Sequence, residues 1–226
     1  MSDPSGARIP LSRTFVAAFA YNNPVAAQLL GLCPLLAVSN NVVNALGLSL
    51  ASVFVIVCSN ALISLARKNI PDISRLACFV LVIATFTTLA SLLLEAFAFT
   101  LYERVALFVQ LIVTNCMILG RAEAFASRQP LAPTFMDSLG TGLGFAVIMI
   151  TLGATRELLS SGTLLTQSET LFGTDLTLQV LPNGVWPLAQ FAPGAFIVIG
   201  VLLGLGTWLI ERIRHRNFQP AAEDEH

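Results

Sequence analysis

The stretch LIVTNCMILGRAEAFA, residues 111–126, joins a membrane-type apolar run to polar residues that such a run normally excludes. Asn115 and Cys116 interrupt the run, and after a few more apolar residues Gly120 and Arg121 end it. A thiol within an apolar segment, with a charge just beyond the segment's end, needs a structural explanation. The stretch therefore decides between an ordinary membrane helix and a broken one.

The composition indicates an integral membrane protein. Of the 226 residues, 55% are hydrophobic and 11% are charged, whereas soluble domains carry about 25% charged residues. Apolar blocks close to or above ~18 residues recur along the chain, as in membrane-spanning helices. The formal net charge of −1 offers no basis for nucleic-acid binding. We expect an all-α polytopic protein surrounded by lipid, with six transmembrane segments at about residues 25–38, 44–66, 76–98, 105–120, 138–155 and 193–210.

The distribution of Lys and Arg predicts the orientation of these segments. If each segment crosses the membrane, one side carries ten basic residues, at the N-terminus, in the loop 67–75, after the fourth segment and at the C-terminus. The other side carries two, Arg104 and Arg156. Because cytoplasmic loops carry the excess of positive charge, both termini should be cytoplasmic and the connection 156–192 should face outward.

The two ends of the chain are expected to lie outside the transmembrane segments. Arg8 and Arg13 precede an apolar stretch of barely seven residues, which favours an interfacial amphipathic helix over a cleaved signal peptide. Residues 217–226 end in AAEDEH and are expected to form a disordered acidic tail.

The two halves of the chain resemble each other in order. LGLCPLLAVSNN (30–41) has the shape of IVTNCMILGRAE (112–123), with 83 residues between the two cysteines. NALGLSLASV (44–53) aligns with DSLGTGLGFA (137–146) at an offset of 93. Each half has three segments, and an odd number reverses the second half in the membrane. We therefore predict a single membrane domain built from two inverted three-helix repeats, at about residues 15–98 and 103–213.

The two cysteine-bearing segments are the short ones. Residues 25–38 and 105–120 number 14 and 16, against the ~20 needed to cross a ~30 Å core. Short, interrupted segments at matching positions of two repeats indicate half-helices that meet near the middle of the membrane. Cys33 and Cys116 should therefore lie close together beside the pseudo-twofold axis, buried in protein rather than in lipid.

Three roles are open to these thiols. Cysteines in apolar helices usually fill space, which is our interpretation of Cys58 and Cys78. The second role is ion transport, in which oxygen atoms at the half-helix ends bind a hard cation. The third is a metal centre, because thiolates favour iron–sulfur clusters, zinc or copper(I). The side chains available for the transport role are Asn40, Asn41, Asn115 and Glu123.

The matching positions of Cys33 and Cys116 on two broken segments argue against mere packing. A [2Fe–2S] cluster usually needs four cysteines, so the other two would come from a second subunit of the same architecture. Such a centre within the bilayer would pass electrons between cofactors on opposite faces. Arg121 and Glu123 are two residues apart and do not face each other on a helix, so we expect them to anchor the end of the half-helix at a water-filled edge.

Several stretches of the chain resemble the E subunit of the Rnf electron-transport complex, over nearly all six segments. These stretches are GLCPLLAV (31–38), NALGLSLA (44–51), LIVTNCMILGRAEAFA (111–126), RELLSSGTLL (156–165) and PGAFIVIG (193–200). The D subunit of the sodium-translocating NADH:quinone reductase is a close relative, which shares TNC…GRAEAFA and a stretch similar to MDSLGTGLGF (136–145). The run Cys33-Pro34-Leu35-Leu36 and the basic tail after Glu211 favour the Rnf member.

The resemblance implies a subunit of a translocase in the bacterial inner membrane that couples electron flow between ferredoxin and NAD to Na⁺ or H⁺ movement. In that family the subunit pairs with the homologous A subunit, of opposite orientation. A [2Fe–2S] cluster lies between the two, with two cysteines from each, and the matching positions here are Cys33 and Cys116. The B, C, D and G subunits are the further partners that the resemblance implies.

The same resemblance implies that this subunit binds no NAD and is not catalytic alone. Consistently, GTGLG (140–144) lies within a membrane segment and lacks the strand–turn–helix context of a dinucleotide site. We expect Gly31, Asn115 and Gly120 to lie near the cluster, because glycines allow a close backbone approach and N–H donors tune the cluster potential. Asn40, with Arg121 and Glu123, is expected at the half-helix ends.

Overall fold

The computed structural model describes residues 14–15, 18, 28–67, 70–71, 74–97, 99–161, 163–164, 178–179 and 191–217. These residues are helical, as predicted, apart from one antiparallel pair of two-residue strands, β1 (Thr163–Leu164) and β2 (Leu178–Gln179). The strands lie in the long connection 156–192. The acidic tail and nearly all of the predicted interfacial helix fall outside the described residues.

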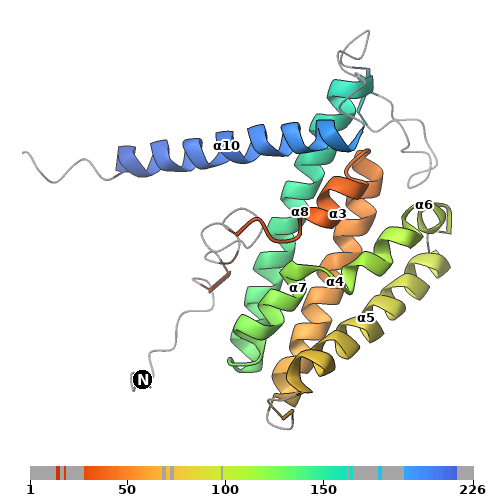
Figure 1. The fold of residues 1–226 in the computed structure, drawn as a ribbon, viewed down its shortest axis with the longest axis vertical. Helices are drawn as coiled ribbons and strands as arrows, with labels where there is room; N and C mark the ends of the chain where they lie inside the picture. Colours follow the sequence, from red (N-terminus) through yellow and green to blue (C-terminus); the bar gives the residue numbers. More distant parts are fainter. Residues whose placement is uncertain are drawn as a thin grey trace, which may run out of the picture.

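Three helices are long and apolar enough to cross a membrane: α4 (Val42–Ala66), α5 (Arg75–Phe97) and α8 (Leu131–Ser161). They contain 25, 23 and 31 residues, more than the ~20 that a bilayer core requires. Figure 1 shows α4 and α8 side by side along the long axis of the molecule, with α5 on the other side of α4. The structure thus confirms a multi-helix membrane body.

The core of this body is the antiparallel pair formed by α4 and α8, which approach closely at glycines. A Cβ at Gly142 would lie 3.2 Å from the Cγ2 of Ile56, and a Cβ at Gly153 would lie 3.2 Å from that of Ala45. Small residues at such crossings let two backbones come together in a membrane, where packing rather than the hydrophobic effect holds helices. Buried apolar side chains such as Leu48 surround the crossing.

The predicted fourth segment, 105–120, is divided in the structure. Helix α6 (Phe99–Val109) passes into a short 3₁₀ turn, η3 (Gln110–Ile112), and a new helix, α7 (Cys116–Arg121), begins after Asn115. The helix does not end at Gly120-Arg121, because the chain continues as one π-helical turn, η4 (Ala122–Ala126). A π-helical turn inside an α-helix is often found at functional sites.

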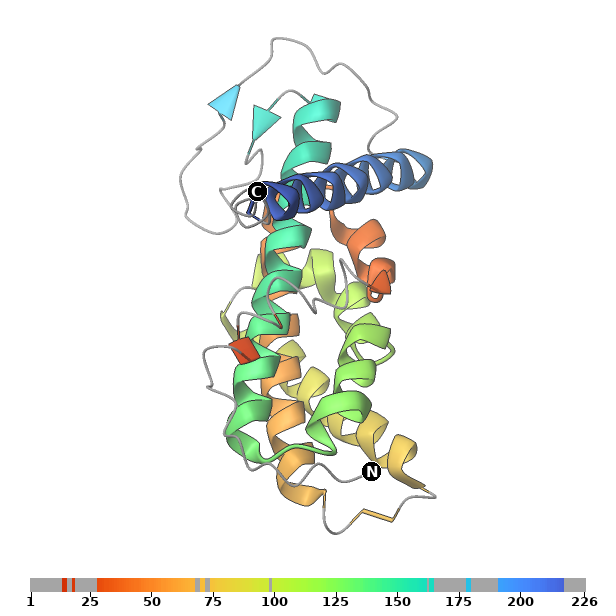
Figure 2. The ribbon, with the colours of Figure 1, turned by 90° about the vertical axis from the view of Figure 1, so that its left-hand side faces the viewer.

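The first predicted segment is also short. Helix α3 (Leu32–Val38) has seven residues and is followed by a tight reversal into α4; residues 25–27 of that predicted segment lie outside the described part. In both views α3 and α7 lie on the same side of the α4–α8 pair (Figures 1 and 2). The two thiol-bearing segments therefore share one face of the molecule.

The last helix, α10 (Ala192–Asn217), lies across α8 rather than along it (Figures 1 and 2). Its apolar part, Pro193–Gly206, is shorter than a typical membrane span. Side chains such as Phe196 and Val201 on this helix are exposed. Among the described residues three helices meet the length and composition of a membrane span, so a count of six spans stays a prediction.

Candidate functional site

The first cysteine segment begins at a glycine in a left-handed conformation. Gly31, the N-cap of α3, has φ 84°, a region that favours glycine. A Cβ at this position would also lie 3.2 Å from both Asn115 Oδ1 and the Cβ of Met117. Cys33 follows in the first turn of α3 and is exposed on the surface of the chain.

The second cysteine segment begins at an asparagine cap. The Asn115 side chain accepts a hydrogen bond from the backbone N–H of Met117 at 3.0 Å, which is the usual geometry of an N-cap. Because Oδ1 receives that donor, the other end of the amide is Nδ2. Asn115 is 3% exposed, and its Nδ2 has no hydrogen-bond partner among the described residues. Cys116 is the first residue of α7 and is exposed.

The two segments meet through one hydrogen bond. The backbone N–H of Gly31 donates to the Sγ of Cys116 at 3.1 Å. These residues are 85 apart in sequence, and Cys33 comes two residues after Gly31. The structure therefore brings the beginnings of α3 and α7 together, with both thiols in first helical turns and a backbone donor already directed at one of them.

The ligand set within the described residues is incomplete for a cluster. No group of three or more His, Cys, Asp or Glu side chains comes close enough there to hold a metal ion. Cys58 and Cys78 lie on the long helices α4 and α5 and are partly buried. The chain thus presents two exposed thiols on one face, which suits a site that a second chain completes.

Beyond the thiol, α7 is tied to α8 by an ion pair. Arg121, its last residue, donates to the carboxylate of Asp137 from Nε at 3.0 Å and also from NH2. Asp137 is 2% exposed, and the guanidinium also stacks over Phe125 at 5.5 Å from the ring centre. The predicted anchoring role of Arg121 is consistent with this contact, although Asp137 was missed as the partner.

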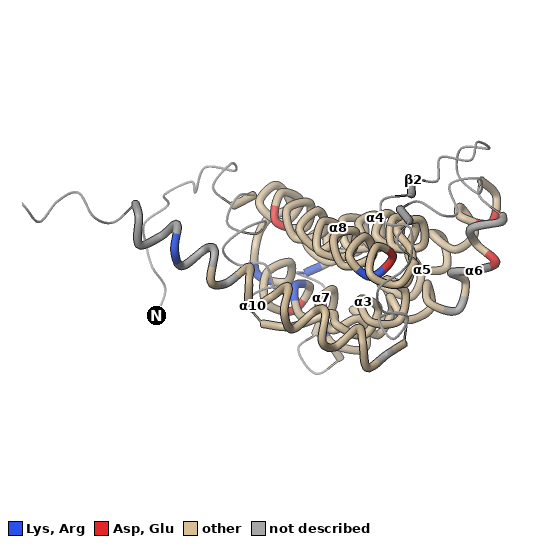
Figure 3. The backbone as a smooth tube through the Cα atoms, turned by 90° about the horizontal axis from the view of Figure 1, so that it is seen from above, with Lys and Arg blue, Asp and Glu red and all other residues tan. Residues whose placement is uncertain are grey.

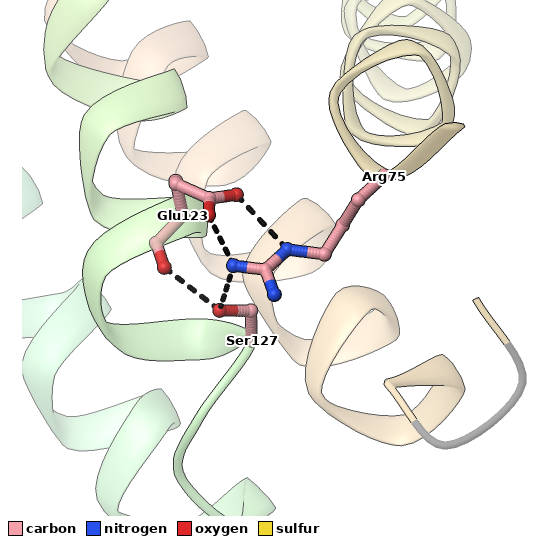
Figure 4. A network of polar contacts seen from close by, with 3 residues as sticks. All are labelled: Arg75, Glu123 and Ser127. Atoms are coloured by element: carbon pink, nitrogen blue, oxygen red, sulfur yellow. Dashed lines mark hydrogen bonds and ion pairs between the residues drawn. The ribbon is translucent and has the colours of Figure 1, made fainter. Parts of the chain in front are cut away.

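Glu123 has a different partner, as Figure 4 shows. Arg75, the first residue of α5, donates to the Glu123 carboxylate from Nε at 3.2 Å and from NH2. Ser127 joins the network by donating to the backbone carbonyl of Glu123 at 2.7 Å. Arg121 and Glu123 do not pair with each other but bind separate helices, α8 and α5.

Arg156 and Glu157 were predicted to lie at the start of the outward connection, but the structure places both within α8. Their exposures are 1% and 2%. Arg156 NH1 donates to the carbonyl of Leu36 at 3.2 Å and to the Ser39 hydroxyl at 2.8 Å. The Glu157 carboxylate accepts from the backbone N–H of Val42 at 2.9 Å. The helix extends six residues beyond the predicted end of the fifth segment, 155, and so includes them.

Figure 3 shows how sparse charge is along the helices, most of whose length is uncoloured by acidic or basic residues. The signal that could have revealed this buried pair is the run RELLSS after an apolar segment. All of its first four residues are good helix formers, so the helix continues past the last strongly apolar residue.

Three further predicted site residues have plainer surroundings. Asn40 lies half-buried in the reversal between α3 and α4, next to Asn41, which is the N-cap of α4 without a side-chain cap bond. Gly120 lies inside α7, and a Cβ there would meet only Leu30, at 3.8 Å. Gly120 therefore shows no need for glycine, in contrast to Gly31.

Fold and site together define a polytopic helical membrane protein in which two short helices present thiols on one face. Residues 11–203 match the Rnf-Nqr family, described as the Rnf-Nqr subunit, a membrane protein. The chain belongs to this family.

Its curated relatives carry one name, the E subunit of the ion-translocating oxidoreductase complex. The chain is 47% identical to that protein of Pseudomonas paraeruginosa (strain DSM 24068 / PA7) over 199 residues, which cover 86% of this chain and 83% of the relative. It is 45% identical to that of Pasteurella multocida (strain Pm70), with 84% and 87% covered. For Shewanella baltica (strain OS185) the identity is 46%, with 89% of each covered. The resemblance inferred from the cysteine motifs is thereby confirmed.

Proposed function

We propose that this chain is the E-type membrane subunit of an ion-translocating ferredoxin:NAD⁺ oxidoreductase of the bacterial inner membrane. In this proposal it carries electrons across the bilayer through a [2Fe–2S] cluster shared with the homologous A subunit. The complex as a whole includes the B, C, D and G subunits. The names and identities of the relatives support membership of such a complex. The observation that carries the redox role is the contact of Gly31 with Cys116 between two exposed thiols.

The residues present fit such a cluster. Thiolates are the usual ligands of [2Fe–2S] centres, and Cys33 and Cys116 are exposed where a second chain can add two more. The cluster, when bound, accepts and releases one electron. The Gly31 N–H stabilises negative charge on the Cys116 sulfur, since a donor to a thiolate favours its charged form. The buried Nδ2 of Asn115 is a second donor beside the same thiol.

The inverted repeat is part of this proposal, and reciprocal contacts between α4 and α8 support it. Gly153 approaches Ala45 at one end of the pair. At the other end Asn60 donates to the Ser138 hydroxyl at 2.9 Å. Asn60 and Gly153 are 93 residues apart, as are Ala45 and Ser138. The offset found in the sequence therefore exchanges the two contacts, as a local twofold axis does.

The orientation follows from the same proposal. With both termini cytoplasmic, the turn between α3 and α4 faces outward and the turn between α7 and α8 faces inward. The homologous A subunit would have the opposite orientation, so that equivalent thiol faces meet at the midplane. A reporter at residue 175 should be labelled from outside in intact cells, and one at residue 220 should not.

Two other functions have less support. The D subunit of the sodium-translocating quinone reductase shares the cysteine motif, but the relatives found at 45–47% identity are named as E subunits. A transporter without a redox centre would need free oxygen ligands at the half-helix ends, and the carboxylate of Glu123 is engaged by Arg75.

The deciding experiment measures iron content and the reduced-state EPR spectrum of the purified complex. Cys33→Ser and Cys116→Ser should each lose the cluster signal, because serine is a poor replacement for a thiolate ligand. Cys58→Ser and Cys78→Ser are the matched controls and should keep both the iron and the spectrum. Unchanged iron and an unchanged spectrum in the first two variants would contradict the proposal.

A further inference from the structure

We infer that Arg156 and Glu157 are positioning residues for Cys33: from α8 they hold both sides of the α3–α4 turn and thereby fix the first turn of α3. The meaning of that position for electron transfer rests on the proposed function. The contacts themselves do not, because they lie between α8 and the ends of α3 and α4.

Arg156 acts on the C-terminal end of α3. The last four carbonyl groups of a helix have no partner within it, and Leu36 is among them in α3. Arg156 NH1 donates to this carbonyl and to the hydroxyl of Ser39, the C-cap. A cation at this end also complements the helix dipole. Cys33 precedes Leu36 by three residues, a rise of about 4.5 Å along the helix.

Glu157 acts on the N-terminal end of α4. Its carboxylate accepts from the backbone N–H of Val42, one of the first donors of α4 that lack a partner within the helix. The side chain of Asn41, the N-cap, makes no capping bond. Two neighbouring residues of α8 therefore cap both helices that flank the turn 39–41.

Helix α3 depends on such external support. Helices shorter than ~12–15 residues are marginal on their own, and α3 has seven residues, LCPLLAV, none of them charged. Gly31 provides no side-chain cap at its beginning. The equally short α7 supplies its own anchor, because its Arg121 reaches Asp137 on α8. For α3 the charge has to come from α8.

Burying two charges in a membrane protein is costly, and such residues are usually functional. The positions that correspond to them at the other end of the α4–α8 pair, 93 residues earlier, are Ile63 and Ser64. Ser64 donates to the carbonyl of Gln129 at 2.9 Å, just before α8. That end is thus held at the same positions without charge, and Ser64 offers a matched control for Glu157.

The test measures the rate at which N-ethylmaleimide alkylates Cys33 and Cys116 in native membranes that hold the complete complex, followed by mass spectrometry. Arg156→Gln should raise the rate at Cys33 about fivefold or more, the change expected for losing a buried charge at a helix end. Cys116 in the same sample should change far less. Glu157→Gln should have a smaller effect in the same direction, because the amide still accepts from Val42.

Arg156→Lys should restore most of the wild-type rate at Cys33, since it keeps the cation. Ser64→Ala should leave Cys33 unchanged. The inference is overturned if Arg156→Gln leaves Cys33 as protected as in the wild type, if both thiols become reactive together, or if Arg156→Lys rescues nothing.

This outcome is separate from that of the proposed function. If Cys33→Ser keeps its iron and Arg156→Gln still exposes Cys33 selectively, positioning holds and the cluster assignment fails. If Cys33→Ser loses iron and Arg156→Gln leaves the alkylation rate unchanged, the cluster holds and positioning fails. In the iron-containing complex Arg156→Gln should also shift the EPR line shape, whereas Ser64→Ala should not.

Discussion

Helices α3 and α7 carry the two exposed thiols and are both tied to α8 by an arginine, but the arginine belongs to different partners. For α3 it is Arg156 of α8, which reaches back to Leu36 and Ser39. For α7 it is the helix's own Arg121, which reaches forward to Asp137 of α8. The two halves of the chain thus solve one mechanical problem with residues at positions that do not correspond.

A repeated fold can therefore keep a contact between elements without keeping the residues that make it. Position 156 corresponds to Ile63 by the offset of 93, and Ile63 belongs to a buried apolar cluster with Ala122. Ala122 in turn corresponds to Ser39 by the offset of 83. The same pair of positions is polar at one end of the molecule and apolar at the other.

Breaking the α7 tie should have the largest effect on stability. Arg121→Gln leaves the carboxylate of Asp137, 2% exposed, without its partner, and loss of one member of a buried pair costs about 3–5 kcal/mol. Thermal unfolding of the detergent-solubilised complex should shift accordingly. The double variant Arg121→Gln, Asp137→Asn should recover most of the loss, because it removes the uncompensated charge. Equal destabilisation in the single and double variants would contradict this reasoning.

The beginnings of the two helices should differ next. Gly31→Ala places a side chain at φ 84°, which costs about 1–2 kcal/mol, and its Cβ crowds Asn115 and Met117 at 3.2 Å. Gly120→Ala is the control, since a Cβ there has room and alanine gains about 0.5–1 kcal/mol in a helix interior. The same unfolding assay should show opposite signs for the two variants. A loss of similar size at Gly120 would show that the first helix is not special.

The two ends of the α4–α8 pair should differ by a smaller amount. A double-mutant cycle with Asn60→Ala and Ser138→Ala should give a coupling of about 0.6 kcal/mol, the average for hydrogen bonds between membrane helices, and no more than about 1.7 kcal/mol. At the other end, Gly153→Ala should destabilise by crowding Ala45 and the Asn41 carbonyl. A coupling near zero at Asn60 would mean that packing alone holds that end.

The sequence predicted the long helices well because their signal is local. The bounds of α4 and α5 fall within two residues of the predicted segments 44–66 and 76–98, since continuous apolar runs there end at polar residues. Helix α8 starts seven residues before its predicted segment, 138–155, and ends six after it, because its ends are polar but buried by α3, α4 and α7.

The candidate site was predicted in part for the same reason. Matching cysteines on short segments led to the expectation that the segments meet, and the Gly31–Cys116 contact agrees with it. The ion pairs could not be predicted, because Arg121 with Asp137, and Arg75 with Glu123, are joined by tertiary packing that no local pattern encodes. The break at Asn115 was visible as a polar interruption, but its consequence, a new helix beginning at Cys116, needed the cap geometry.

The Arg75–Glu123 pair should make the smallest contribution of the four. Its side chains are 26% and 42% exposed, so solvent screens the attraction, and exposed pairs contribute about 0–1 kcal/mol. Arg75→Gln should therefore lower the unfolding temperature only slightly, and raising the salt concentration should reduce the difference from the wild type further. Arg121→Gln should keep its full effect at high salt, because Asp137 is shielded from the solvent. A loss in Arg75→Gln as large as that in Arg121→Gln would mean that Arg75 and Glu123 are buried in the assembled complex, on a surface that another protein of the complex covers.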